Sequence, residues 1–214
     1  MNSPVIAIYG DSISLDSYPG GGWPSRVVAS LEPAQLYNHA IGASGLSSTT
    51  PNNTVTLLER PEWQHPDADI VLFWHGTNDW YWGAPVGEIG QADAATYAGA
   101  IECAVRKLRG INPRVRIVWM TPILRCQPPS GVDASRATEA WDTPNRIGAT
   151  MKDYVDVLTE QSRRLCFPLI DLRTLTCFSP ENKELFYRDI AHPSGEGFDR
   201  IADLIARHLR LWYL

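Results

Sequence analysis

Four side chains of the types used in acyl transfer stand beside predicted strands or helices of this chain. Ser12 directly follows an apolar run near the N-terminus, at a point where a buried strand must break. Asn78 follows another apolar run, the third along the chain, and Asp189 and His192 precede the last predicted helix. A hydroxyl, a carboxamide, a carboxylate and an imidazole are the groups that nucleophilic acyl transfer needs.

Taken alone, each of these residues could also have a purely structural role. Gly10, Asp11 and Ser12 are all turn formers, and Asp189 could cap the helix that follows it. As a catalytic set they have definite roles, because a serine hydroxyl is a weak nucleophile until a base such as an imidazole removes its proton. The three-residue spacing of Asp189 and His192 lets the carboxylate reach the imidazole and fix its tautomer.

Whether these residues meet depends on the elements that carry them. Five apolar runs are typical of buried strands: Val5–Tyr9, Leu36–Ala40, Asp69–Trp74, Val115–Met120 and Phe167–Asp171. Five segments show helical spacing: Trp23–Leu31, Asn52–Arg60, Gln91–Arg109 with Gly110 ending it, a helix within 138–165 that is clear from Pro144 onward, and Gly195–Leu211. This alternation predicts an α/β fold with a parallel sheet between helical layers. In such sheets ligands bind at the carboxyl ends of the strands, so we expect the polar clusters to converge there.

The motifs, in their order along the chain, resemble those of the SGNH/GDSL hydrolase family of esterases and lipases. The matching blocks are GDS at Gly10–Ser12, a glycine block around Gly42, GTND at Gly76–Asp79, and DxxH at Asp189–His192. Together they span residues 10 to 192. The resemblance implies a three-layer α/β/α sandwich with a five-stranded parallel sheet in the flavodoxin-like order 2-1-3-4-5. We therefore expect a single domain over residues 1–214.

The resemblance also implies a role for each motif residue. Ser12 would be the nucleophile, His192 the general base, and Asp189 the residue that orients the imidazole. The oxyanion hole would consist of the backbone N–H groups of Ser12 and Gly42 and the side-chain amide of Asn78. The residue types alone also allow structural roles, since a glycine at 42 suits a left-handed backbone or a close approach of the backbone, and an asparagine at 78 suits an Asx turn. We expect the neighbouring carboxylates, Asp11 and Asp79, to order their loops.

Three further residues are candidates for substrate binding. Trp80 and Trp82 lie with Tyr81 in an aromatic-rich stretch beside Asn78, where they could form a platform for a sugar ring or an apolar acyl group. Packing of this stretch against the helical layer is the alternative. Arg125 follows the fourth predicted strand and could contact a substrate carboxylate or phosphate, although a surface ion pair is the interpretation that we favour.

These observations predict a serine esterase that cleaves carboxylic esters through an acyl-enzyme, with no metal and no cofactor. No broad apolar channel is visible in the sequence, so the leading substrates are short-chain acyl esters such as O-acetyl groups on a carbohydrate. The alternative is a lysophospholipase or thioesterase. A non-catalytic carbohydrate-binding protein would not need the complete catalytic set, and a metal-dependent phosphatase would need a ligand cluster that the sequence lacks.

Composition restricts the remaining possibilities. The 214 residues carry a net charge of −5 with a pI near 5.5, which does not suit a nucleic-acid partner. The four cysteines, Cys103, Cys126, Cys166 and Cys177, show no zinc-ligand spacing, and we expect free thiols. No apolar stretch reaches the roughly 18 residues of a membrane span, and no signal-peptide pattern precedes the first strand. We therefore expect a cytoplasmic protein, or a secreted one if a leader has been removed.

Two features remain with open interpretations. Residues 126–145 are rich in proline and polar side chains, and they could form a lid or flap over the site, or a surface insertion. The remaining histidines show no metal-ligand pattern, and we expect them to pack or to lie on the surface: His39, His65, His75 and His208.

Overall fold

The computed structural model describes residues 3–33, 35–133 and 139–213, and its centre is a five-stranded parallel sheet. The strands are β1 (Val5–Gly10), β2 (Gln35–Asn38), β3 (Ile70–Trp74), β4 (Arg116–Met120) and β5 (Leu169–Ile170). Their order is β2-β1-β3-β4-β5, and every neighbouring pair is parallel. The expected fold class and strand order are confirmed.

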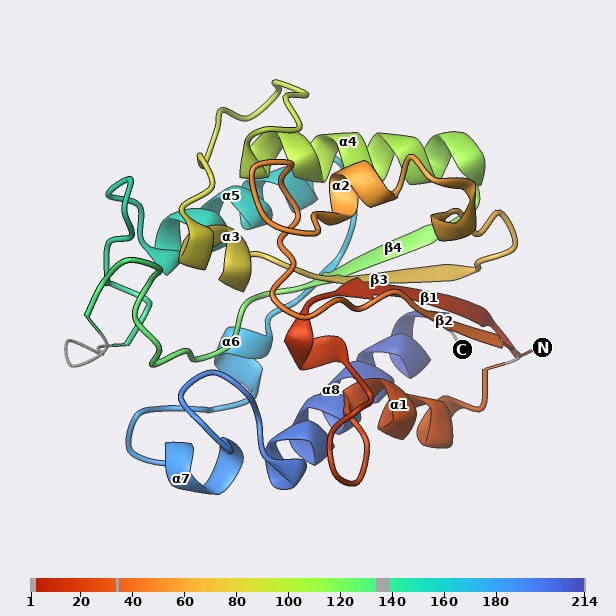
Figure 1. Ribbon diagram of the computed structural model, residues 1–214. Helices are drawn as coiled ribbons and strands as arrows, with labels where there is room; N and C mark the ends of the chain where they lie inside the picture. Colours follow the sequence, from red (N-terminus) through yellow and green to blue (C-terminus); the bar gives the residue numbers. More distant parts are fainter. Residues whose placement is uncertain (1–2, 34, 134–138, 214) are drawn as a thin grey trace.

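Helices cover both faces of this sheet (Figure 1). They are α1 (Trp23–Leu31), α2 (Thr54–Leu57), α3 (Thr77–Trp82), α4 (Tyr97–Ile111), α5 (Met151–Arg164), α6 (Leu172–Leu175), α7 (Lys183–Phe186) and α8 (Gly195–Tyr213). Two short 3₁₀ turns, η1 (Ser12–Ser14) and η2 (Pro61–Trp63), complete the described elements. Helices α2, α4 and α5 lie over one face, and α1 and α8 lie side by side over the other.

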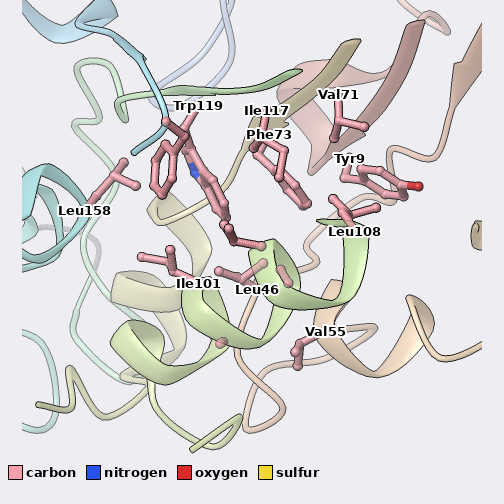
Figure 2. Close-up of a cluster of buried hydrophobic side chains, with 14 of the residues drawn as sticks. Tyr9, Leu46, Val55, Val71, Phe73, Ile101, Leu108, Ile117, Trp119 and Leu158 are labelled. Atoms are coloured by element: carbon pink, nitrogen blue, oxygen red, sulfur yellow. The ribbon is translucent and has the colours of Figure 1, made fainter. Parts of the chain in front are cut away.

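The two faces of the sheet form two separate hydrophobic cores. Successive side chains of a strand point to opposite faces, so Ala7 and Tyr9 of β1 pack on the α4 side while Ile6 and Ile8 pack on the α8 side. Figure 2 shows the first core, in which Phe73 and Trp119 are stacked with ring centroids 4.2 Å apart. Because both faces are covered, the central strands β1 and β3 are apolar along their whole length, as expected for buried strands of a parallel sheet.

Helix α4 differs from the prediction at both ends. It begins at Tyr97 instead of Gln91, because the Thr96 side chain accepts a hydrogen bond from Gly99 N and caps the helix there. It also continues through Gly110 to Ile111. A glycine ends a helix when the chain needs a left-handed residue, and Gly110 does not have a positive φ.

The remaining boundaries show smaller differences. Helix α5 begins at Met151, not near Pro144, because Thr150 and Asp153 form a capping box at that point. Helix α2 is limited to Thr54–Leu57, and the Asn53 side chain caps it by accepting a hydrogen bond from Thr56 N. Helix α8 runs on to Tyr213. The short helices α3 and α6 follow β3 and β5, and α7 lies between α6 and α8. Hydrophobic spacing did not predict these three helices.

The fold contains no disulfide bond among the four cysteines and, among the described residues, no membrane-spanning helix. All four cysteines are free; Cys103 and Cys126 are half-buried, and Cys166 and Cys177 are exposed. Within the described ranges, no helix has the length and apolar character that crossing a membrane requires.

Candidate active site

The turn after β1 holds Ser12 at the carboxyl edge of the sheet. Asp11 caps the 3₁₀ turn η1, with its Oδ1 accepting a hydrogen bond of 2.9 Å from Ile13 N. The turn closes tightly over Gly10, where an added Cβ would lie only 2.4 Å from Ser14 Oγ. The GDS sequence therefore has a structural reason for its glycine and its aspartate, and the ordering role expected of Asp11 is confirmed.

The three residues of the predicted triad are in hydrogen-bond contact. Ser12 Oγ lies 2.9 Å from His192 Nε2, and His192 Nδ1 lies 2.9 Å from Asp189 Oδ2. Asp189 Oδ1 also accepts hydrogen bonds from the backbone N–H groups of Ala191 and His192, at 2.8 and 2.7 Å. The loop between α7 and α8 thus holds the imidazole and its carboxylate as one unit.

The same contacts determine the charge of Asp189. Partial burial alone would raise the pKa of its carboxyl, but the hydrogen bonds from Ala191 N and from His192 outweigh burial and leave the pKa below its ordinary value. Asp189 is therefore ionised at neutral pH. An ionised carboxylate accepts the Nδ1–H of the imidazole, which directs the free lone pair of Nε2 toward Ser12.

Asn78 and Gly42 line a pocket with the triad serine and histidine. The pocket has a volume of about 410 Å³, and its lining consists of Ser12, Gly42, Ala43, Asn78, Tyr81, Trp82, Arg125, Gln127 and His192. Asn78 lies in the first turn of α3, and its carboxamide makes long-range contacts: Nδ2 donates to Ser44 O at 2.9 Å, and Oδ1 accepts from Arg125 Nη1 at 3.1 Å. The alternative of an Asx turn is therefore wrong for Asn78.

The glycine at position 42 has no steric reason within the chain. The left-handed residue of this turn is Ala43, with φ 61°, while Gly42 does not have a positive φ. An added Cβ at Gly42 would meet only Leu15 Cδ1, at 4.0 Å. The left-handed alternative is therefore wrong, and any crowding at this backbone N–H would come from a molecule bound in the pocket.

Two buried carboxyl groups lie beneath the site. Asp79 accepts hydrogen bonds from Leu46 N and Ser47 N, and so ties the loop after β2 to α3. Burial raises the pKa of Asp79 to about 6, against the opposing effect of those hydrogen bonds. Burial likewise raises the pKa of Asp11 to about 7, and the nearby charge of Asp79 adds to this, whereas Ile13 N and Arg125 lower it.

The aromatic stretch after Asn78 divides between core and pocket. Trp80 is fully buried, donates from Nε1 to Thr143 O at 3.1 Å, and does not line the pocket. Tyr81 and Trp82 do line it, with their rings edge to face at 4.8 Å between centroids. Trp82 Nε1 donates to Ala43 O, which fixes the indole across the loop after β2. Trp80 thus follows the packing alternative.

Arg125 is buried, and the expectation of a surface ion pair is wrong. Only 7% of the residue is exposed, and its guanidinium contacts Asn78 and Gln127 at the pocket wall. The reason is that the segment after β4 runs under the pocket instead of over the surface: Cys126 N donates to Ile190 O in the loop that carries His192.

The sequence analysis did not predict two residues that contact the site. Gln127 lines the pocket and accepts a hydrogen bond of 2.6 Å from Arg125 Nη2. Its position just beyond a strand end was the available signal. Tyr18 donates its hydroxyl to Ser12 O at 2.7 Å, and its ring lies 6.3 Å from that of His192. Nothing in the local sequence distinguishes Tyr18 from an ordinary loop tyrosine.

The remaining predicted features lie away from this pocket. His75 is fully buried and contacts Thr54 Oγ1 at 2.8 Å, and His39 and His65 stack on each other, so these three histidines pack as expected. Over the described ranges there is no group of three or more side chains suited to hold a metal ion. Of the predicted lid at 126–145, residues 134–138 lie outside the described residues, and its movement stays a prediction.

Comparisons with known proteins identify the family and agree with the fold. A family model described as the GDSL-like lipase/acylhydrolase family matches residues 8–200. A structure of a protein from Lactobacillus plantarum is similar over 100% of both chains, with a TM-score of 0.83 and 20% identity. A structure described as a possible lipase from Chitinophaga pinensis has a TM-score of 0.74 and 22% identity, over 97% of this chain and 98% of its own. A lipase/acylhydrolase from Enterococcus faecalis has a TM-score of 0.63 and 20% identity, over 97% and 95%. A search of curated proteins found no match.

Proposed function

Because the chain belongs to the GDSL-like lipase/acylhydrolase family and is an ester hydrolase, we propose that it works through an acyl-enzyme formed on Ser12. The observation that carries this proposal is the unbroken series of hydrogen bonds from Ser12 Oγ through the His192 ring to Asp189. Each contact is short enough for proton transfer or for a charge-assisted hydrogen bond.

In the proposed reaction, His192 Nε2 takes the proton of Ser12 Oγ as that oxygen attacks the ester carbonyl. Asp189 stabilises the resulting imidazolium and keeps the ring in the productive tautomer. His192 then gives the proton to the departing alcohol, which leaves the acyl group on Ser12. A water molecule repeats the attack with His192 again as the base, and the carboxylic acid is released.

The oxyanion of each tetrahedral intermediate would be bound by Ser12 N–H, Gly42 N–H and Asn78 Nδ2. All three residues line the same pocket. Within the described part of the chain, Ser44 O takes one Nδ2 hydrogen of Asn78, and the second hydrogen has no partner. The open space around Gly42 supports the same role, since it leaves room for the substrate oxygen.

We propose short-chain acyl esters, such as O-acetyl groups on a carbohydrate, as the substrates. The pocket volume of about 410 Å³ suits one sugar unit or a short acyl group better than a long acyl chain. Tyr81 and Trp82 offer aromatic surfaces of the kind that pack against sugar rings, and Gln127 and Arg125 bring planar polar groups to the same wall.

The second candidate is a lysophospholipase or thioesterase, and one observation favours it. Ile190, which lies between Asp189 and His192, is 44% exposed, and Leu185 of α7 is 60% exposed. Ile190 is two residues before His192, so we infer that an acyl chain extending beyond the pocket on this side would meet its side chain. The preferred acyl length separates this candidate from the first.

The test is hydrolysis of p-nitrophenyl esters from acetyl to decanoyl by the wild type, Ser12→Ala and Ser17→Ala. Ser17 is an exposed serine in the same loop and serves as the matched control. We expect Ser12→Ala to lose at least about 10³-fold in kcat, Ser17→Ala to keep wild-type activity, and a fluorophosphonate to label Ser12 alone. Equal rates for the wild type and Ser12→Ala would refute the acyl-enzyme. An optimum at octanoyl or longer would favour the lipid esterase.

A further inference from the structure

Arg125 is a buried cation at the pocket wall. Across the described ranges, no carboxylate lies within ion-pair distance of its guanidinium. Burial lowers the pKa of Arg125 to about 10, although the more distant charges of Asp11 and Asp189 act in the opposite direction. Burying a charge without an oppositely charged partner costs free energy of folding. The hydrogen bonds of this guanidinium therefore indicate that its position has a function.

The contacts of the guanidinium hold it against α3. Nη1 donates to Thr77 Oγ1 at 3.1 Å and to Asn78 Oδ1 at 3.1 Å, and Nη2 donates to Gln127 Oε1 at 2.6 Å. The guanidinium carbon lies 4.6 Å from the centre of the Tyr81 ring. Arg125 Nε is buried and has no partner in the described part of the chain. The polar contacts of Arg125 are therefore directed mainly at the residue proposed as an oxyanion donor and at its neighbour.

We propose that Arg125 is a positioning residue that acts through Asn78. A guanidinium only donates hydrogen bonds, so its contact with Asn78 requires the carbonyl oxygen of the carboxamide on that side and turns Nδ2 toward the pocket. Ser44 O, which accepts from Nδ2, favours the same orientation. Without the contact from Arg125, that hydrogen bond alone would oppose a flip that presents Oδ1 to the oxyanion and repels it. The inference rests on the proposed function, because it assumes that Asn78 binds the oxyanion.

The positive charge has a second effect on the same donor. A hydrogen bond from a cation to Oδ1 polarises the carboxamide and makes its N–H a stronger donor, as in hydrogen-bond chains inside proteins generally. Negative charge develops on the substrate oxygen in the transition state and not in the bound ester. The contribution of Arg125 therefore belongs to kcat, and KM for a neutral ester should change little.

A double-mutant cycle with p-nitrophenyl acetate tests this inference. We expect Asn78→Ala to lower kcat by roughly 10²–10³-fold and Arg125→Met to lower it by roughly 10–10²-fold. In the Asn78→Ala background, Arg125→Met should cost less than about 3-fold more, because its target is already absent. Arg125→Lys keeps the positive charge and an ammonium group that can donate to Asn78 Oδ1, so it should recover part of the loss. Equal factors in both backgrounds would overturn the proposal.

Two further measurements separate positioning from folding and from substrate binding. The rate at which a fluorophosphonate labels Ser12 should fall in Arg125→Met, because the phosphoryl oxygen occupies the oxyanion hole; an unchanged rate contradicts the proposal. Arg173→Met is the matched control, since Arg173 also stacks on an aromatic ring, at 4.6 Å from Trp141, and lies outside the pocket. It should keep wild-type kcat.

An effect confined to KM for an anionic ester, such as a p-nitrophenyl hemisuccinate, would overturn the proposal and make Arg125 a substrate-binding residue. If Arg125→Met does not fold, Arg125→Lys and Arg125→Gln complete the same cycle. Failure of the proposed function is distinguishable from failure of this inference, because in that case Ser12→Ala would remain active and Ser12 would not be labelled in the wild type.

Discussion

Ser12 Oγ and His192 Nε2 lie 2.9 Å apart, although almost the whole domain separates the two residues in sequence. Each side chain is held by its own loop. Asp11 caps the turn that carries Ser12, and Asp189 binds the backbone and the ring of His192. The first loop follows β1 and the second precedes α8, so both are anchored in the packed layers of the fold. The two loops are therefore held in place by contacts of their own, and changes that break the Ser12–His192 contact should affect catalysis more than stability.

Asp189→Asn tests whether catalysis can be lost without a loss of stability. The asparagine Oδ1 can still accept from Ala191 N and His192 N, so the loop should keep its shape. The side-chain amide cannot replace the ionised carboxylate beside Nδ1, and we expect kcat to fall by roughly 10²–10⁴-fold. Because the Asp189 side chain is 47% exposed, the melting temperature should change little.

Asp203→Asn is the control for this variant, because Asp203 is an exposed carboxylate of α8 that pairs with Arg207 on the surface. It should keep wild-type kcat. The prediction is wrong if Asp189→Asn retains more than about a tenth of the wild-type kcat, or if its loss of activity follows a comparable loss of folded protein in thermal unfolding monitored by circular dichroism.

The fold could be predicted from the sequence because its strongest signals are local. Strand β3 is apolar on every residue, as a strand covered on both faces must be, and helix α1 was predicted with its observed bounds. The errors came from side chains that cap. Whether Thr96 or Gln91 begins a helix depends on which side chain meets a free N–H group, and hydrophobic spacing does not contain that information.

The site could be predicted where residue type alone determines the chemistry. Ser12, Asp189 and His192 were predicted as a set, and the structure brings them into contact. The surface ion pair expected for Arg125 was wrong, and Trp80 does not line the pocket. Both side chains are buried, and burial depends on how the whole chain packs. An arginine after a strand is usually exposed, and only the path of the segment after β4 shows that Arg125 lies under the pocket.

A comparison of Trp80→Ala with Trp82→Ala tests whether Trp80 belongs to the core and Trp82 to the pocket. Trp80 is fully buried, so its removal should lower the free energy of unfolding by about 3–5 kcal/mol. Trp82 is half-buried at the pocket, so its removal should cost less than about 1.5 kcal/mol and should mainly raise KM for a carbohydrate acetate. Urea unfolding and steady-state kinetics on both variants check this. Equal loss of stability in the two would contradict it.

Gly10→Ala should destabilise the protein, whereas Gly42→Ala should not. The Cβ added at Gly10 would lie 2.4 Å from Ser14 Oγ, which is buried and hydrogen-bonded to Trp23 Nε1. We expect a loss of roughly 1–3 kcal/mol in stability for Gly10→Ala. Gly42→Ala should unfold at the wild-type temperature, because its Cβ meets only one atom at 4.0 Å. Thermal unfolding decides, and a large destabilisation by Gly42→Ala would show that position 42 is constrained by the fold.

Asp11→Asn should change how stability depends on pH. Burial raises the pKa of Asp11 to about 7 in the folded chain, from an ordinary value of 3.8. The folded state therefore binds this proton more tightly than the unfolded state does. The stability that the protonated carboxyl contributes is fully present below about pH 3.8, declines as the pH rises, and is lost above about pH 7. A shift of this size corresponds to at most about 4 kcal/mol.

An asparagine at position 11 keeps an oxygen that can accept from Ile13 N, but it never ionises. Relative to the wild type, Asp11→Asn should therefore gain stability steadily between about pH 4 and pH 7, and the gain should level off above about pH 8. Urea unfolding of both proteins at about pH 4.5, 6 and 8 measures the difference directly. A difference that is the same at all three values would mean that Asp11 is ionised in the folded chain throughout, with Arg125 as the charge that stabilises it.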